Sequence, residues 1–119
     1  MMPRILIVDD EAELRESIGE YLTKHGYEVE MAENGHAALE KTQKTQYSLI
    51  VTDVKMPHMT GVGFLSMFRL SNKTTPVILF TGFSDTTEEV CLQLGATKVL
   101  AKPIRRKELL SEVKALIPN

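Results

Sequence analysis

The sequence has little of what secreted, membrane-spanning or nucleic-acid-binding proteins need. Its single cysteine, Cys91, excludes an internal disulfide, and no apolar run approaches the ~20 residues of a membrane span. The formal net charge is −2, so the basic surface typical of nucleic-acid binding is missing. No charged leader precedes a long apolar stretch, so no signal peptide is predicted. We therefore expect a cytoplasmic protein that contacts neither membrane nor nucleic acid.

The sequence also lacks the loops and ligand spacings of several common sites. Neither G-x-x-x-x-G-K-[ST] nor G-x-G-x-x-G, the glycine-rich patterns that bind nucleotide phosphates, occurs in the 119 residues. The three histidines, His25, His36 and His58, are not spaced as metal ligands. These absences direct the search for a site toward the acidic residues.

What the sequence does contain is a regular alternation of short apolar runs and helix-like segments. Four runs have the composition of strands buried on both faces, and a fifth segment alternates as an edge strand does. These segments are Ile5–Val8, Leu49–Val51, Val77–Phe80, Val99–Ala101 and, for the edge strand, Tyr27–Ala32. Five strands alternating with five helices predict an α/β fold, a doubly wound parallel sheet forming one domain over residues 1–119.

Glycine, asparagine and aspartate mark where several predicted helices begin and end. Gly26 and Gly95 are placed to end the first and fourth helices, because glycine adopts a left-handed backbone freely. The pair Asn34–Gly35 is placed to turn the chain into the second helix. Asp85, with Glu88 three residues later, has the spacing of a capping box, so the fourth helix is predicted to begin there.

Acidic residues stand at the ends of two buried strands. Asp9 and Asp10 follow the first strand, and Asp53 ends the third. Because the carboxyl ends of parallel strands meet at one edge of a sheet, we expect these carboxylates to converge. Two carboxylates ~4 Å apart repel by roughly 4 kcal/mol at an effective dielectric of about 20, and hard oxygen ligands favour Mg²⁺ as the relieving cation. Taken singly, a helix cap at Asp9 or Asp10 and a turn at Asp53 are simpler interpretations; all three together favour a metal site.

Asp53 is also a candidate nucleophile. It stands alone at its strand end, and a carboxylate can accept a phosphoryl group as an aspartyl phosphate. Thr81 and Lys102, at the ends of the fourth and fifth strands, offer a hydroxyl donor and a cation to phosphoryl oxygens. Each has a structural alternative: Thr81 as a β-branched strand residue, and Lys102 as an exposed strand end. Pro103 permits a cis peptide bond after Lys102 and adds weight to a special local geometry.

The segments that carry these residues occur in a specific order along the chain. The first is Ile5–Glu11, which ends in two aspartates and a glutamate. The second is Asp53–Pro57, with Gly61 eight residues after the aspartate. Thr81–Gly82 and Lys102–Pro103 complete the set. In this order, over essentially the whole chain, they resemble the receiver domain of two-component response regulators.

The resemblance implies a flavodoxin-like fold with strand order 2-1-3-4-5 and a phosphoacceptor site at its edge. Asp53 would accept a phosphoryl group from the phosphohistidine of a sensor histidine kinase or a histidine phosphotransfer protein. Mg²⁺ would be bound by Asp10, Asp53 and the backbone carbonyl of Lys55, with Asp9 helping through water. Thr81 would then follow the phosphoryl group.

The resemblance also implies how phosphorylation would change the surface of the domain. Lys102 would pair with the phosphoryl group, and the face made by the fourth helix, fifth strand and fifth helix would shift between two conformations. Its target would be an output domain, a downstream protein or, in a phosphorylation-dependent homodimer, a second copy. Such a domain is a signalling unit rather than an enzyme, because it assists only its own phosphorylation and dephosphorylation.

The sequence departs from the family at Val99, three residues before Lys102. Family members commonly carry Tyr or Phe there as a rotamer switch, and a β-branched aliphatic side chain cannot swing inward as a ring does. We therefore expect output to rely on the loop after Thr81 and on the fourth helix, with Phe83 moving as well. Lys55 and Phe83 occupy positions that flank the phosphoryl group in the family, so bulky Phe83 is predicted to shield it from water.

Three other functions fit parts of the pattern. A receiver-like interaction module that works without phosphorylation would not need all five polar residues at the strand ends, which are Asp9, Asp10, Asp53, Thr81 and Lys102. An aspartyl-phosphate hydrolase of the haloacid dehalogenase type would carry an acid where Lys55 stands. Flavin electron transfer would need a phosphate-binding loop where Asp9 and Asp10 would repel phosphate. Both a stand-alone regulator and a part of a longer one fit the sequence.

Overall fold

Five parallel strands form a single sheet in the order β2-β1-β3-β4-β5. The computed structural model describes residues 2–56, 59–82 and 88–117. Its strands are β1 (Arg4–Val8), β2 (Glu28–Ala32), β3 (Leu49–Asp53), β4 (Val77–Thr81) and β5 (Lys98–Ala101). Its helices are α1 (Ala12–Lys24), α2 (Gly35–Lys44), α3 (Gly61–Phe68), α4 (Glu88–Gln93) and α5 (Arg106–Leu116). The predicted doubly wound α/β fold and its strand order are confirmed.

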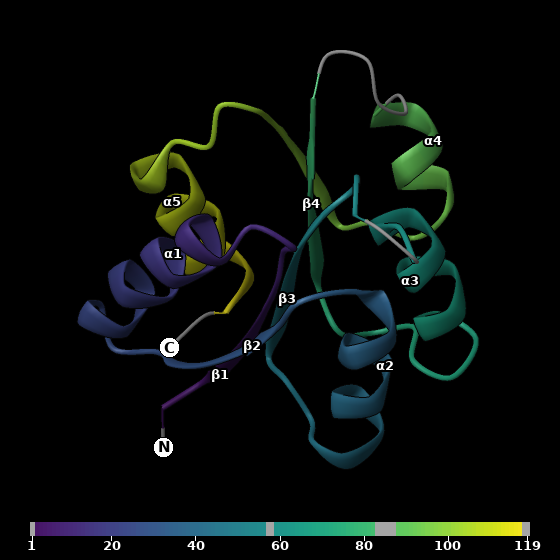
Figure 1. Cartoon of the computed structure of the whole chain (residues 1–119), viewed down its shortest axis with the longest axis horizontal. Helices are drawn as coiled ribbons and strands as arrows, with labels where there is room; N and C mark the ends of the chain where they lie inside the picture. The colour runs from purple at the N-terminus through teal and green to yellow at the C-terminus, as the bar shows by residue number, and fades with distance from the viewer. Residues whose placement is uncertain (1, 57–58, 83–87, 118–119) are drawn as a thin grey trace.

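The helices cover both faces of the sheet. Helices α1 and α5 lie on one side, and α2, α3 and α4 lie on the other (Figure 1). Alternate side chains of each strand therefore enter different apolar layers. In β1, Ile5 and Ile7 belong to the layer under α1 and α5, whereas Leu6 and Val8 belong to the opposite layer. Burial on both faces explains why this strand is continuously apolar in the sequence.

Several helix boundaries agree with their sequence signals. Asn34 is the N-cap of α2, where its side-chain oxygen accepts a backbone N–H of the first turn at 2.8 Å. Gly26 and Gly95 follow α1 and α4 with φ angles of +97° and +110°, the left-handed backbone expected of them. The predicted Asp85 cap of α4 lies outside the described residues.

Helix α4 buries little of its apolar surface. Cys91 is fully buried, as expected for a small core residue. Its sequence neighbours Val90, Leu92 and Leu94 are instead between 36% and 46% exposed, so α4 contacts the core chiefly through the cysteine. Neither α4 nor any other helix in the described part of the chain is long and apolar enough to cross a membrane.

The turn after β3 brings α3 very close to the strand end. Gly61, the first residue of α3, donates its N–H to the carbonyl oxygen of Val54 at 2.8 Å. A Cβ atom added at Gly61 would overlap the backbone carbonyl of Asp53. Helix α3 can therefore approach the end of β3 only because residue 61 has no side chain.

We predict that Gly61→Ala lowers the free energy of unfolding by about 3 kcal/mol or prevents folding, because the new methyl group meets backbone that cannot rotate away. Gly63→Ala is the matched control on the same helix. A Cβ atom there would lie 3.3 Å from the Thr60 hydroxyl oxygen, and alanine favours a helix over glycine by about 1 kcal/mol. Urea unfolding measures both variants, and equal midpoints for the two would contradict the prediction.

Candidate functional site

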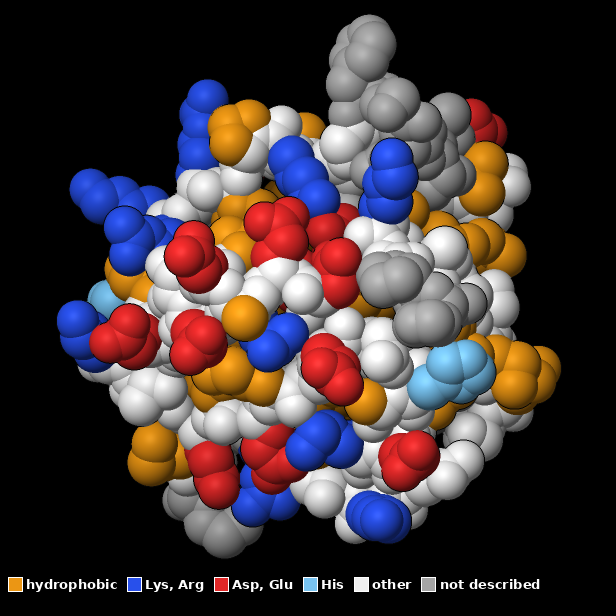
Figure 2. Space-filling model, viewed as in Figure 1, with side chains coloured by type: hydrophobic (Ala, Val, Ile, Leu, Met, Phe, Trp, Pro, Cys, Tyr) orange, Lys and Arg blue, Asp and Glu red, His pale blue; other side chains and the backbone are white. Residues whose placement is uncertain are grey.

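Carboxylates from β1 and β3 meet at the carboxyl edge of the sheet. The register places Val8 opposite Thr52, so Asp9 and Asp10 follow β1 beside Asp53, the last residue of β3. One carboxylate oxygen from each of the three acids lies within 4.8 Å of the others. Figure 2 shows acidic side chains gathered near this edge, with Lys and Arg side chains next to them. The structure thus brings together the three acids singled out in the sequence.

The three acids differ in how they are held. Asp9 and Asp53 are each 1% exposed, whereas Asp10 is exposed. Oδ1 of Asp9 accepts the backbone N–H of Glu11 at 2.8 Å. Glu11 is itself the N-cap of α1 and makes no side-chain cap, so the alternative in which Asp9 or Asp10 caps this helix is wrong.

Both carboxylate oxygens of Asp53 have hydrogen-bond donors. Oδ1 accepts the backbone N–H of Lys55 at 3.2 Å, which is the turn that the simpler interpretation of Asp53 expected. Oδ2 lies 2.7 Å from Nζ of Lys102, whose side chain is only 29% exposed. Lys102 therefore does not extend into solvent from its strand end but reaches back to the buried acid.

The ends of β4 and β5 complete the edge. Phe80 pairs with Asp53, so Thr81 lies one residue beyond that pair, partly buried at the end of β4. The Thr81 carbonyl accepts the backbone N–H of Lys102 at 2.9 Å, which joins the two strand ends. The peptide bond between Lys102 and Pro103 is cis, the geometry that the proline permitted.

A hollow open to solvent lies over the acids and is suited to a hard cation beside an anion. It is lined by Asp10, Glu11, Asp53, Lys55, Met56 and Lys102. The acids offer oxygen ligands, the set that Mg²⁺ prefers, and the lysines offer positive charge to a bound anion. The donor set therefore fits Mg²⁺.

Burial at the crowded acidic edge changes the proton affinity of Asp9. Burial is the main cause that raises the pKa of Asp9 from 3.8 to about 6, and repulsion from Asp53 and Asp10 adds to it. The N–H of Glu11 and the charge of Lys102 oppose this rise in pKa without cancelling it. The site therefore favours added positive charge, whether from a proton or from a metal ion.

The structure places at the acidic edge one residue that the sequence did not indicate, Arg15. Nη1 of Arg15, on α1, donates to the backbone carbonyl of Asp9 at 2.7 Å. An arginine six residues after the first acid was the only available signal, and it resembled an ordinary exposed helix residue. Phe83, predicted to shield the site, and His58, given no role, lie outside the described residues.

The raised pKa of Asp9 predicts a pH-dependent instability. Between pH ~4 and ~6 the folded chain binds the Asp9 proton more tightly than the unfolded chain, so this group's contribution to stability falls as pH rises through the window. We expect Asp9→Asn, measured without divalent cations, to raise the free energy of unfolding at pH 8 by roughly 1–3 kcal/mol. At pH 4 the gain should be much smaller, because the wild-type carboxyl is then protonated in the folded chain.

Glu16→Gln is the control for Asp9→Asn, since it makes the same charge change on the exposed surface of α1. Urea unfolding at both pH values gives the difference from wild type for each variant. A gain for Asp9→Asn that is equal at pH 8 and pH 4 would rule out ionisation of Asp9 as its cause.

Comparison with known proteins gives the same family throughout. The sequence profile described as "Response regulator receiver domain" matches residues 5–114. The response regulator ArlR of Staphylococcus saprophyticus is 36% identical over 117 residues, which are 98% of this chain and 53% of that protein. The CpxR homolog of Haemophilus influenzae, a transcriptional regulatory protein, is 37% identical over 98% of this chain and 51% of its own length. The chain thus spans about half the length of the curated relatives it matches.

Solved structures agree with the sequence match. The response regulator protein TrrA of Thermotoga maritima, in complex with Mg²⁺–BeF, is 35% identical with a TM-score of 0.89, and the match covers 98% of this chain and 100% of that one. Sequence and fold therefore agree over nearly the whole chain. The chain belongs to the receiver domain family of two-component response regulators.

Proposed function

We propose that Asp53 accepts a phosphoryl group from the phosphohistidine of a sensor histidine kinase or histidine phosphotransfer protein. The observation that carries this proposal is the environment of the Asp53 carboxylate. It is buried at a strand end, one oxygen is paired with Lys102 and the other is bound by a backbone N–H. A carboxylate oriented in this way, beside two further acids, is arranged for nucleophilic attack rather than for packing.

The proposed site needs Mg²⁺, and the residues present fit it. Asp10, Asp53 and the backbone carbonyl of Lys55 would hold the ion directly, and Asp9 would help through water. When bound, the ion supplies positive charge that neutralises both carboxylates and phosphoryl oxygens. The Mg²⁺–BeF complex of the related protein TrrA supports this assignment.

In the transfer step, a carboxylate oxygen of Asp53 attacks phosphorus as the bond from phosphorus to the donor histidine nitrogen breaks. The electron pair of that bond stays on the imidazole. Formation of the acyl phosphate removes the negative charge of the Asp53 oxygen, so Nζ of Lys102 would pair with the new phosphoryl oxygens instead. Thr81, at the end of the neighbouring strand, would donate its hydroxyl to another of these oxygens.

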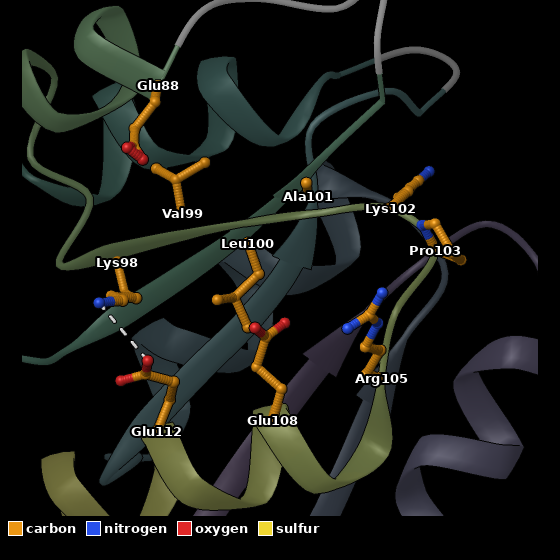
Figure 3. A pocket seen from close by; sticks show the side chains of 10 residues that line it. All are labelled: Glu88, Lys98, Val99, Leu100, Ala101, Lys102, Pro103, Arg105, Glu108 and Glu112. Carbon is orange, nitrogen blue, oxygen red and sulfur yellow. Dashed lines mark ion pairs between the residues drawn. The ribbon is translucent and has the colours of Figure 1, made fainter.

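The proposed output is a conformational change of the surface formed by α4, β5 and α5. A pocket between these elements extends along β5 to Lys102, so its lining begins at the phosphoacceptor site (Figure 3). Lys98 and Glu112 join β5 to α5 through an ion pair of 3.4 Å. Val99 lines the same pocket and packs partly buried against the apolar layer under α2, α3 and α4. Movement of Thr81 and Lys102 toward a phosphoryl group would shift this surface.

We further propose that residues 1–119 form a single domain and that the protein is cytoplasmic. Its target would be an output domain or a downstream protein, or a second copy in a phosphorylation-dependent homodimer. Its catalysis would be limited to its own phosphorylation and dephosphorylation. A receiver-like module that works without phosphorylation is not favoured, because such a module would not need Lys102 paired with Asp53 beside two more acids.

The proposal predicts Mg²⁺-dependent labelling by phosphoramidate, a small donor that has the phosphorus–nitrogen bond of phosphohistidine. Intact mass spectrometry should show one phosphoryl group on the wild-type chain with Mg²⁺ and none with EDTA. Asp53→Asn should abolish the labelling, because an amide cannot form the acyl phosphate. Hydroxylamine should remove the label, since it cleaves acyl phosphates and leaves phosphoserine intact.

The control for the labelling experiment is an established receiver domain treated in parallel. Glu16→Gln, which alters an exposed acid of α1, should label like wild type. No label on the wild-type chain, under conditions that label the established receiver, would favour the phosphorylation-independent module instead.

The aliphatic side chain at position 99 predicts an output that does not use an aromatic rotamer. Val99→Tyr should therefore alter phosphorylation-dependent behaviour of the α4, β5 and α5 surface while leaving phosphoryl uptake at Asp53 within about threefold of wild type. NMR spectra of wild type and variant, each recorded with and without Mg²⁺ and beryllofluoride as a stand-in for the phosphoryl group, give the change in the amide shifts of Lys98 and Glu112. Identical shift changes in wild type and variant would show that position 99 has no part in the switch.

A further inference from the structure

Arg15 is a cationic side chain near the acidic edge to which the proposed function gives no role. It lies near the start of α1, is partly buried, and donates from Nη1 to the backbone carbonyl oxygen of Asp9 at 2.7 Å. We infer that Arg15 is a positioning residue, which holds Asp10 in the direction needed to bind Mg²⁺. The inference rests on the proposed function, because it concerns the same cation.

The Asp9 carbonyl lies where the ladder between β1 and β2 stops. The Asp9 N–H still donates to the carbonyl of Ala32 at 3.1 Å. In a continuing parallel ladder the next donor to Asp9 would be the N–H of Asn34. Asn34 is instead the N-cap of α2, so the chain has already turned away from the sheet. Arg15 supplies the missing donor, and its charge makes the bond stronger than a neutral one.

Planarity of the peptide bond carries this constraint to Asp10. The carbonyl of Asp9 and the N and Cα atoms of Asp10 lie in one peptide plane. The bond from Arg15 therefore restrains the orientation of the plane to which the Asp10 Cα belongs. On its other side, the N–H of Glu11 is bound to the Asp9 carboxylate at 2.8 Å. Asp10 is exposed and has no burial to hold it, so these two anchors fix the backbone from which its carboxylate projects.

Because Arg15 is positively charged, a positioning role and a purely electrostatic role predict opposite changes in Mg²⁺ affinity when the side chain is removed. Coulomb's law alone predicts that removing a cation near the site strengthens the binding of Mg²⁺. Loss of a positioning hydrogen bond predicts the opposite, because groups that orient metal ligands typically contribute about 10- to 100-fold in metal affinity. The direction of the change in affinity therefore distinguishes the two explanations.

The test is a Mg²⁺ titration of the whole chain by isothermal calorimetry, supported by NMR shifts of the Asp10 and Glu11 amides. Arg15→Met keeps an apolar stem and removes the donor, and Arg15→Gln is made in parallel in case one variant fails to fold. Both should bind Mg²⁺ about tenfold more weakly than wild type. Lys24→Met removes an equal charge from the last turn of α1 and should leave the affinity unchanged. Urea unfolding in EDTA establishes that each titrated variant is folded.

Each outcome of the titration has a distinct meaning. Equal or tighter binding of Mg²⁺ by a folded Arg15 variant, with normal binding by wild type, overturns the positioning role and leaves the proposed function standing. Absence of Mg²⁺ binding by wild type overturns the proposed function and this inference with it. Weaker binding by the Arg15 variants, with Lys24→Met unchanged, supports the inference.

Discussion

Repulsion between carboxylates is the constraint on which the rest of this site depends. Asp9, Asp10 and Asp53 hold oxygens within 4.8 Å of one another, and two of the three side chains are almost completely buried. Ionised groups so close together destabilise a fold unless positive charge is added. Lys102 offsets part of this charge at Asp53, and the balance of the four groups stays negative. The fold thus maintains an unfavourable arrangement that a divalent cation would relieve.

The backbone holds the acids in place against this repulsion. N–H groups of Glu11 and Lys55 bind the two buried carboxylates, and each belongs to the turn that follows its own strand. Gly61 lets α3 approach the end of β3 without a clash, which positions the loop that contains Lys55. Both turns begin where a parallel ladder ends, so the sheet itself determines where the charges lie.

Lys102 connects this charge to the ends of β4 and β5. Its side chain pairs with Asp53, while its backbone N–H binds Thr81 and its chain position directly follows β5. Any change in the charge of Asp53 therefore acts on the ends of β4 and β5 together. With the aliphatic Val99 three residues before Lys102, the proposed route to the surface runs through these strand ends and α4 rather than through an aromatic ring.

Chain patterning was enough to predict the strands, their buried character and the polar residues that end them. Strands covered on both faces must be continuously apolar, and the register of a parallel sheet carries their ends to one edge, so Asp9, Asp53 and Lys102 could be identified from chain position alone. The bond from Arg15 to the carbonyl of Asp9 and the rise in the pKa of Asp9 to about 6 became evident only once the chain was packed. Hydrogen bonds to backbone and desolvation depend on which groups packing brings together and what it excludes from water, and residue type does not encode either.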